Sequence, residues 1–147
     1  MKTITHILVP TDFEQPSAEA LEMATSVARA YGAQLTLLHV WEIPVYPYID
    51  FMVNAEAITR VEDAAVKHLA EALEKLQATF PGARSKLKTG QPGPAILDAI
   101  AELKADLVVI GTHGRHGLNR AVLGSVAEKL VRQSPVPVLT VHAAARS

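Results

Sequence analysis

The chain has 147 residues and a formal net charge of −1, with 49% hydrophobic and 20% charged residues. These values are typical of one globular domain, predicted to span residues 1–147, and the near-neutral charge argues against nucleic-acid binding. No cysteine is present, which excludes disulfides and thiol chemistry. Because the N-terminus is too polar for a signal peptide and no apolar run could cross a bilayer, we expect a cytoplasmic protein without membrane partners.

Apolar runs and helical periodicity alternate from the first residues onward. Residues 7–9 predict a buried strand, and residues 35–40 predict a second one. Between them, Ser17 is the expected N-cap of a helix that Gly32 ends. The apolar stripe of this helix consists of Leu21, Ala24, Ala28 and Tyr31.

The same alternation continues to the end of the chain. Further helices are predicted over residues 54–80, from Gly93-Pro94 onward, and from Ser125 to about Ser134. Strands are predicted at 84–89, at 106–110 and from Val136 to Val141. The strand at 84–89 is polar, and Pro137 cannot donate a ladder hydrogen bond, so these two strands belong at sheet edges.

Strands that alternate with helices of this length predict an α/β fold with right-handed crossovers and a parallel sheet. The most apolar strands suit the buried middle of such a sheet. We therefore expect a three-layer sandwich, in which a five-stranded parallel sheet of order 3-2-1-4-5 carries helices on both faces.

In this sheet the strand order reverses between the first and fourth strands, and ligands of open α/β sheets bind beyond the carboxyl ends of the strands at such a point. Pro10, Thr11 and Asp12 follow the first strand there. The glycine-rich stretch GTHGRHGLNRAVLGS, residues 111–125, follows the fourth strand. It matches neither the Walker A loop nor the G-x-G-x-x-G dinucleotide fingerprint. It is either a nucleotide cradle of another kind or a set of ordinary turn and cap residues.

The end of this stretch indicates an anion site. Ser125 and Glu128 have the spacing of a capping box, which predicts a helix that begins at Ser125. The N-terminus of a helix attracts phosphate, and Gly124 has no side chain to obstruct it. Arg115 and Arg120 could add positive charge.

The spacing Gly111-x-x-Gly114, nine residues, then Gly124-Ser125 resembles the G-2x-G-9x-G(S/T) signature of the universal stress protein family. The resemblance extends to ILVPTDF, LTLLHV, GQPGPAI, DLVVIGTHGR and LGSVAEKLVRQSPVPVLTV, and so covers nearly the whole chain. The intact signature is similar to that of the ATP-binding branch. It implies a Rossmann-like fold, similar to the adenine nucleotide alpha hydrolases, and a homodimer formed by the last strand.

The resemblance also implies roles for single residues. The glycines and Ser125 would contact ribose and phosphates, Asp12 would lie near ribose or a Mg²⁺ ion, and the backbone of Val40 would contact adenine. For Asp12 an Asx-type turn before the first helix is the alternative. The expected nucleotide-binding residues are Pro10, Thr11, Asp12, Val40, Gly111, His113, Gly114, Arg115, Gly124, Ser125 and Val126.

Two further groups of residues have alternative readings. His113 and His116 lack a third metal ligand nearby in sequence, so hydrogen bonding near phosphate is the expected role of these histidines. The segment WEIPVYPYIDF holds Trp41, Tyr46, Tyr48 and Phe51, which form either a lid over the adenine pocket or a cluster packed on the second helix.

The expected function is that of an ATP-binding stress or regulatory protein. Nucleotide occupancy would change its conformation or its binding to an unknown protein partner. No pattern requires catalysis, because no P-loop-type lysine or base is evident, so hydrolysis is expected to be slow. The alternatives are a slow ATPase or adenylate-forming enzyme, and a ligand-free homodimeric interaction protein.

Overall fold

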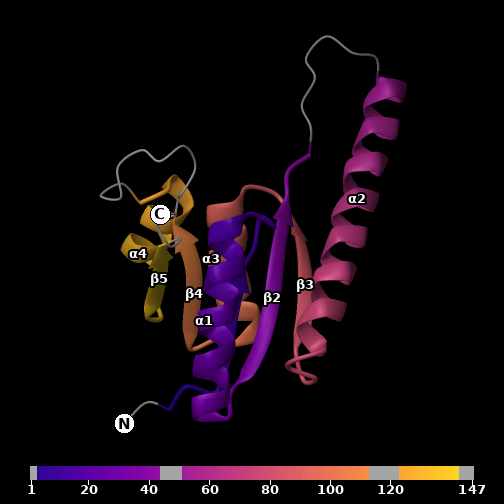
Figure 1. Ribbon diagram of the computed structural model, residues 1–147. Coiled ribbons are helices and arrows are strands. Elements are labelled where there is room, and N and C mark those ends of the chain that lie inside the picture. The colour runs from indigo at the N-terminus through magenta and orange to yellow at the C-terminus, as the bar shows by residue number, and fades with distance from the viewer. Residues whose placement is uncertain (1–2, 44–50, 113–122, 143–147) are drawn as a thin grey trace, which may run out of the picture.

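The computed structural model describes residues 3–43, 51–112 and 123–142, except the side chains of residues 51–54. Its elements, in chain order, are β1 (His6–Pro10), α1 (Gln15–Tyr31), β2 (Gln34–Trp41), α2 (Phe51–Gln77), β3 (Arg84–Thr89), α3 (Pro92–Leu103), β4 (Leu107–Thr112), α4 (Ser125–Gln133) and β5 (Val138–His142). Within these residues the strands form one parallel sheet of order β3-β2-β1-β4-β5, which confirms the predicted topology (Figure 1).

Two cores lie on opposite faces of the sheet, because successive residues of a strand point to opposite sides. In β1, Ile7 and Val9 pack with α1 and α2, whereas Leu8 packs with α3 and α4. All three side chains are fully buried, and each contributes about 2 kcal/mol of hydrophobic stabilisation. Each pair of helices therefore covers one face, which gives the predicted three layers.

Helix α1 begins before the predicted cap. Its N-cap is Glu14, and Pro16 lies in its first turn, where a missing backbone N–H does not matter. Ser17 therefore lies inside the helix, and its prediction as the N-cap is wrong. Gly32 is confirmed as the C-cap, with a left-handed φ of 65°. Tyr31 is 56% exposed and so does not belong to the apolar stripe. The fully buried residues of α1 are Ala20, Ala24 and Ala28.

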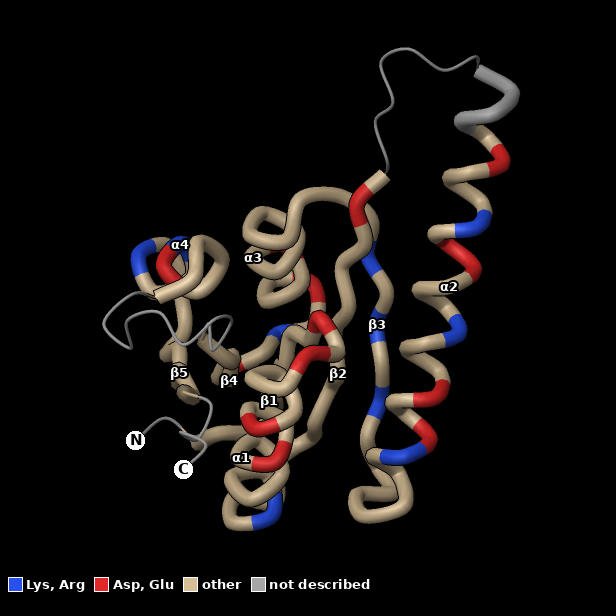
Figure 2. Tube along the Cα trace, turned by 45° about the horizontal axis from the view of Figure 1, so that its top comes forward, with Lys and Arg blue, Asp and Glu red and all other residues tan. Residues whose placement is uncertain are grey.

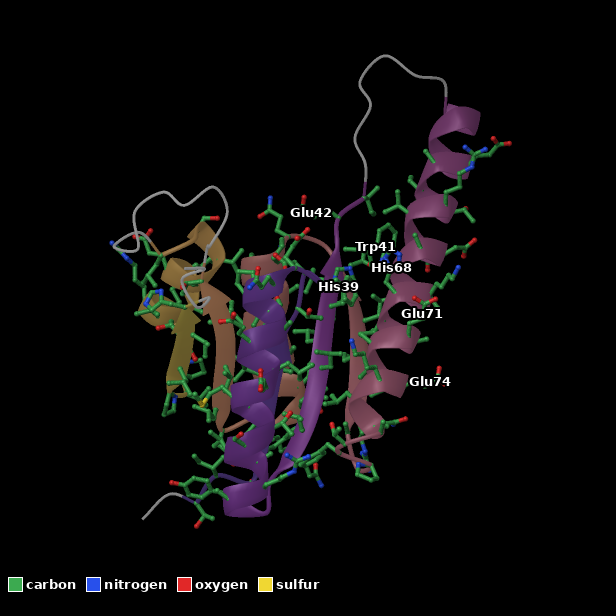
Figure 3. The ribbon with its side chains drawn as sticks, viewed as in Figure 1. His39, Trp41, Glu42, His68, Glu71 and Glu74 are labelled. Atoms are coloured by element: carbon green, nitrogen blue, oxygen red, sulfur yellow. The ribbon has the colours of Figure 1, made fainter. Side chains whose placement is uncertain are left out.

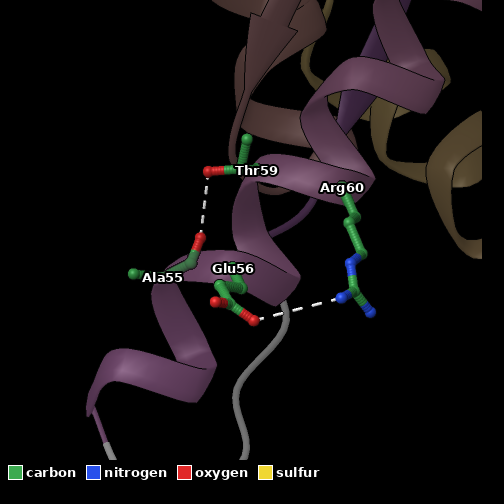
Figure 4. Close-up of polar contacts among 4 residues, drawn as sticks. All are labelled: Ala55, Glu56, Thr59 and Arg60. Atoms are coloured by element: carbon green, nitrogen blue, oxygen red, sulfur yellow. Dashed lines mark hydrogen bonds and ion pairs between the residues drawn. The ribbon is translucent and has the colours of Figure 1, made fainter.

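Helix α2 both begins and ends earlier than the predicted range 54–80. Its first turns extend beyond the carboxyl ends of the strands (Figure 1). In this region the Thr59 hydroxyl donates a hydrogen bond of 3.0 Å to the carbonyl of Ala55, and Arg60 lies 3.9 Å from Glu56 (Figure 4). An exposed i,i+4 ion pair stabilises a helix by only about 0.3 kcal/mol.

Helix α3 begins at Pro92 rather than at Gly93-Pro94, with Gln91 as its N-cap. The fixed φ of proline suits the first position of a helix, and the second of the two prolines then lies within the first turn. Ile96 and Ile100 of α3 are both buried against the sheet.

Strand β4 extends past its predicted end at residue 110 and includes Gly111 and Thr112, which pair with Val141 and His142 of β5. Strand β5 begins at Val138. The prediction that this strand starts at Val136 is wrong, because Pro137 precedes the ladder, and its carbonyl accepts a hydrogen bond from Val108 at 3.0 Å. The positions of β3 and β5 at the two edges are confirmed.

Trp41 belongs to β2 and not to the loop that follows it. It pairs with Thr89 of β3 and is 6% exposed. The part of the lid prediction that rests on Trp41 is therefore wrong. Phe51 is the first residue of α2, whereas Tyr46 and Tyr48 lie outside the described residues.

Candidate functional site

A cavity of about 230 Å³ lies at the carboxyl ends of β1, β2 and β4, at the point where the strand order reverses. This is the place where open α/β sheets bind ligands. The predicted site residues that line it are Pro10, Thr11, Asp12, Val40, Gly111, Gly124 and Val126. Segments from distant parts of the sequence therefore meet in one cavity. His113, Gly114 and Arg115 lie outside the described residues, and Ser125 is exposed and is not among the residues that line the cavity.

Asp12 forms an Asx-type turn, which was the alternative to its ligand role. Its Oδ1 accepts hydrogen bonds from the Ser17 hydroxyl at 2.6 Å and from the backbone N–H of Glu14 at 2.9 Å. The Asp12 N–H donates to Ser17 Oγ at 3.2 Å. The turn orients the carboxylate at the cavity wall, so the two readings of Asp12 are compatible.

Sequence reasoning missed Ser17 and Thr112 as lining residues. Ser17 was interpreted as a helix cap, and only the folded turn brings its hydroxyl to Asp12. Thr112 is 2% exposed, and its hydroxyl lies 2.7 Å from Nδ1 of His142. Strand alternation could have found it, because Val108, Ile110 and Thr112 point to the same side of the sheet.

Gly111 is required by packing. A Cβ atom built at this position overlaps the backbone carbonyl of Pro16 and lies 2.9 Å from the nitrogen of Ser17. Strand β4 therefore approaches the first turn of α1 more closely than any side chain permits. Because both of these backbones also line the cavity, the close contact sets the position of its walls.

Helix α4 presents its N-terminus to the cavity through Gly124, Val126 and Ala127. Its N-cap is Gly124, which makes no side-chain hydrogen bond that would cap the helix. The predicted capping box is therefore wrong, because Ser125 is the first helical residue and Glu128 pairs with Arg132 at 2.9 Å. Among the described residues, no capping side chain therefore competes with an anion for the first N–H groups of α4.

Two residues of β2 form hydrogen bonds with the loop that follows β1. His39 Nδ1 lies 2.8 Å from the carbonyl of Thr11, and the Thr11 N–H donates to the carbonyl of Leu38 at 2.8 Å. Phe13 has a left-handed φ of 66°, and its ring lies 4.4 Å from His39 and 5.7 Å from His68. Figure 3 shows His39 on β2 and His68 on α2 turned toward the same space. His68 is an exposed residue of α2.

Comparisons with known proteins show the family and the fold of this chain. The model of the universal stress protein family matches residues 3–142. The chain belongs to the universal stress protein family. It is 36% identical to a universal stress protein of Thermus aquaticus over 136 residues, which cover 92% of this chain and 97% of the relative.

Solved structures of universal stress proteins share the fold. UspA from Lactobacillus plantarum superposes with a TM-score of 0.79 at 25% identity, covering 96% of this chain and 99% of the other. A universal stress protein in complex with cAMP superposes with a TM-score of 0.72 at 25% identity, covering 97% and 100%. The Rossmann-like, five-stranded architecture is thus that of the family.

Among the described residues, no group of three or more His, Cys, Asp or Glu side chains gathers in a way that could hold a metal ion. Asp12 is the only charged side chain among the described residues that line the cavity. None of the helices in the described part of the chain is long and apolar enough to cross a membrane.

Proposed function

We propose that the cavity binds ATP and that nucleotide occupancy regulates an interaction with a protein partner. The observation that carries the proposal is the N-terminus of α4, which no described side chain caps and which opens at Gly124 into a cavity at the point where the strand order reverses. The cAMP complex of a related universal stress protein supports an adenine nucleotide as the ligand.

The walls of the cavity suit the parts of the nucleotide. Leu38, Val40 and Ile96 give apolar surface for adenine, and the backbone of Val40 lies at the end of β2, where it can meet the edge of the base. The Asp12 carboxylate suits the ribose hydroxyls. The first N–H groups of α4 suit the phosphates, and the family signature adds Gly114 and Ser125 to the same contacts, with His113 and Arg115 beside them.

Asp12 also fits a nucleotide-bound Mg²⁺. Magnesium in nucleotide sites takes one or two carboxylates, with phosphate oxygens and water as the remaining ligands. The Asp12 carboxylate alone supplies too few ligands for Mg²⁺, and the coordination is complete only when phosphate oxygens are also present. We therefore propose that Mg²⁺ enters with ATP, and that when bound it neutralises phosphate charge beside Asp12.

The described walls favour holding ATP over hydrolysing it. Rapid phosphoryl transfer requires cationic side chains on the phosphates and a group that positions the nucleophile. The described residues that line the cavity include neither lysine nor arginine, and the Asp12 Oδ1 is engaged by Ser17 and Glu14. A slow ATPase or an adenylate-forming enzyme is the second candidate. Turnover near 10 s⁻¹, the typical value for enzymes, would favour it over the regulatory role.

The proposed dimer forms through β5. This edge strand exposes Leu139, which is 37% accessible, and an apolar edge strand is ordinarily paired or covered. Sedimentation velocity at micromolar concentration tests the pairing, with Leu139→Lys as the disrupting variant. A monomeric wild type would contradict the dimer and would leave the nucleotide site unaffected.

The nucleotide proposal is tested by direct binding. Protein purified without added nucleotide is denatured, and released ATP, ADP or AMP is identified by mass spectrometry. ATP affinity is then measured by calorimetry for the wild type, Gly124→Val and Gly82→Val. Gly82 has open space around its Cβ position and lies outside the cavity, so it is the matched control.

We expect a more than tenfold loss of affinity in Gly124→Val alone, because the valine side chain occupies the approach to the α4 N-terminus. Equal ATP affinity in Gly124→Val and the wild type would show that the phosphates bind elsewhere. Absence of any adenine nucleotide binding by the folded wild type would favour the ligand-free interaction protein.

A further inference from the structure

A second cavity lies on the opposite face of the sheet, between α1 and α2. It encloses about 640 Å³, which is within the range of small-molecule sites. We call it the α1–α2 groove. Its floor is Leu37 of β2, and its apolar walls include Leu21 of α1 and Leu76 of α2. Leu37 and Leu76 are buried, and Leu21 is partly buried.

The groove has different chemistry at its two ends. At one end, near the start of α1, lie Phe13 and Ala18 together with the acidic residue Glu14. At the other end lie Arg29 and Lys75, each in the last turn of its helix. Figure 2 shows basic residues at the carboxyl ends of both helices. From Ala18 to Arg29 the wall spans about 17 Å, at the rise of an α-helix.

The cationic end is pre-organised and has free donors. Nη2 of Arg29 donates a hydrogen bond of 2.6 Å to the carbonyl of Thr79 on the opposite wall, which fixes the guanidinium across the groove. Neither Arg29 nor Lys75 forms an ion pair with another described residue. Ser26 lies beside them and forms no hydrogen bond within the described part of the chain. A ligand with hydrogen-bond acceptors could therefore bind at this end. The available donors are an ammonium group, the remaining guanidinium N–H groups and a hydroxyl.

The charge at this end is net positive. Each helix carboxyl end contributes about half a negative charge, so the two full cations leave roughly one positive charge in excess. Glu22 is the nearest acidic lining residue of α1, about 10 Å away along the helix axis. An anionic head group therefore gains energy at the Arg29 end and avoids the middle of the groove.

From this polarity we propose that the α1–α2 groove binds an amphipathic carboxylate with a linear alkyl chain. The carboxylate lies between Arg29 and Lys75, and the chain extends over Leu37 toward Phe13. A partner helix suits the space less well. A helix about 10 Å across and 17 Å long occupies roughly twice the volume of the groove.

The test uses dodecanoate below its critical micelle concentration, with binding to the full chain followed by calorimetry. We expect one site per chain, with affinity that rises about fourfold for each methylene from octanoate to dodecanoate. Dodecanol and dodecyltrimethylammonium test the role of charge. Either compound binding as tightly as dodecanoate would contradict the proposal, as would absence of dodecanoate binding.

Variants locate the head group. Arg29→Gln and Lys75→Gln should each weaken dodecanoate binding about fivefold, as expected for partly exposed charges. Lys67→Gln is the matched control, because Lys67 is exposed on α2 but does not line the groove. Equal weakening in Lys67→Gln would mean only non-specific attraction to charge.

Amide chemical shifts distinguish this site from the nucleotide cavity. Dodecanoate should shift the signals of Ser26, Leu37 and Leu76, and leave those of Ile96 and Ala127 unchanged. The reverse pattern would place the chain in the nucleotide cavity and overturn the proposal. Tighter, stoichiometric binding of an acidic amphipathic peptide than of dodecanoate would instead identify the groove as a helix-docking surface.

Discussion

Ser17 and Asp12 exchange two hydrogen bonds: the Ser17 hydroxyl donates to Asp12 Oδ1 over 2.6 Å, and the Asp12 N–H donates to Ser17 Oγ over 3.2 Å. Ser17 is 8% exposed, so its hydroxyl depends on this partner. The pair joins the loop after β1 to the first turns of α1, and both residues line the proposed nucleotide site. The orientation of the Asp12 carboxylate is thus set from α1.

Ser17→Ala should therefore affect both stability and binding. Loss of a buried hydrogen bond destabilises the fold by about 1 kcal/mol, and the freed carboxylate should weaken ATP binding several-fold. Urea unfolding and calorimetry measure the two effects. Ser26→Ala, on the exposed side of the same helix, is the control and should change neither quantity. Unchanged ATP affinity in Ser17→Ala would show that the pair is structural only.

Gly111→Ala should destabilise the protein by about 2 kcal/mol, as overpacking of a close backbone contact does. The added methyl group would overlap the carbonyl of Pro16. Gly82→Ala is the control, since its added Cβ meets no atom within 4 Å, and it should change the unfolding free energy by less than about 0.5 kcal/mol. Equal stability of the two variants in urea unfolding would contradict the tight contact of β4 with α1.

Lys104→Gly should stabilise the protein by about 0.5–1 kcal/mol. Lys104 is the C-cap of α3 and has φ 53° and ψ 43°, a left-handed conformation that glycine adopts without strain. Lys104→Ala retains the Cβ atom and should be nearly neutral, which separates backbone strain from loss of charge. The opposite change, Gly32→Lys at the C-cap of α1, should destabilise by about 1 kcal/mol. Thermal unfolding of the three variants measures the effect.

Asp106 anchors the N-terminal end of β1 and should make stability depend on pH. Burial opposes its ionisation, but hydrogen bonds from the hydroxyl and N–H of Thr5 and from the N–H of His6 outweigh burial, so the pKa of Asp106 is below its ordinary value. A lowered folded-state pKa gives stability that is present above the unfolded value, about 3.9, and is lost as the pH falls through the folded value.

Asp106→Asn should accordingly destabilise the protein by about 1 kcal/mol at pH 7, and the difference from the wild type should shrink below about pH 4. Urea unfolding between pH 3 and pH 7, roughly the range of carboxylate titration, provides the measurement. Asp98→Asn, at an exposed position of α3, is the control and should show no such trend. A difference that stays constant with pH would mean that the carboxylate charge contributes nothing.

The amino-acid sequence by itself determined the topology of the sheet. Apolar runs that alternate with helical periodicity leave few ways to cover both faces, and the polar strand at 84–89 and Pro137 placed β3 and β5 at the edges. The glycine spacing around Gly111 and Gly124 indicated the family and the position of the candidate site. Apolar runs, helical periodicity and glycine spacing are all patterns of residues that are close together in the sequence, so they can be recognised without the structure.

Only the tertiary structure decided how the walls of the site are built. Gly111 lies inside a strand because β4 must pass the Pro16 carbonyl, and Ser17 bonds to Asp12 because the loop folds back on α1. The α1–α2 groove joins Arg29 to Lys75 across two helices. The contact of β4 with Pro16 and the groove between the two helices join segments that are far apart in the sequence, whereas Asp12 and Ser17 are only five residues apart but meet only in the folded turn. None of these contacts leaves a periodic signal in the sequence, because each depends on how the folded backbone is placed.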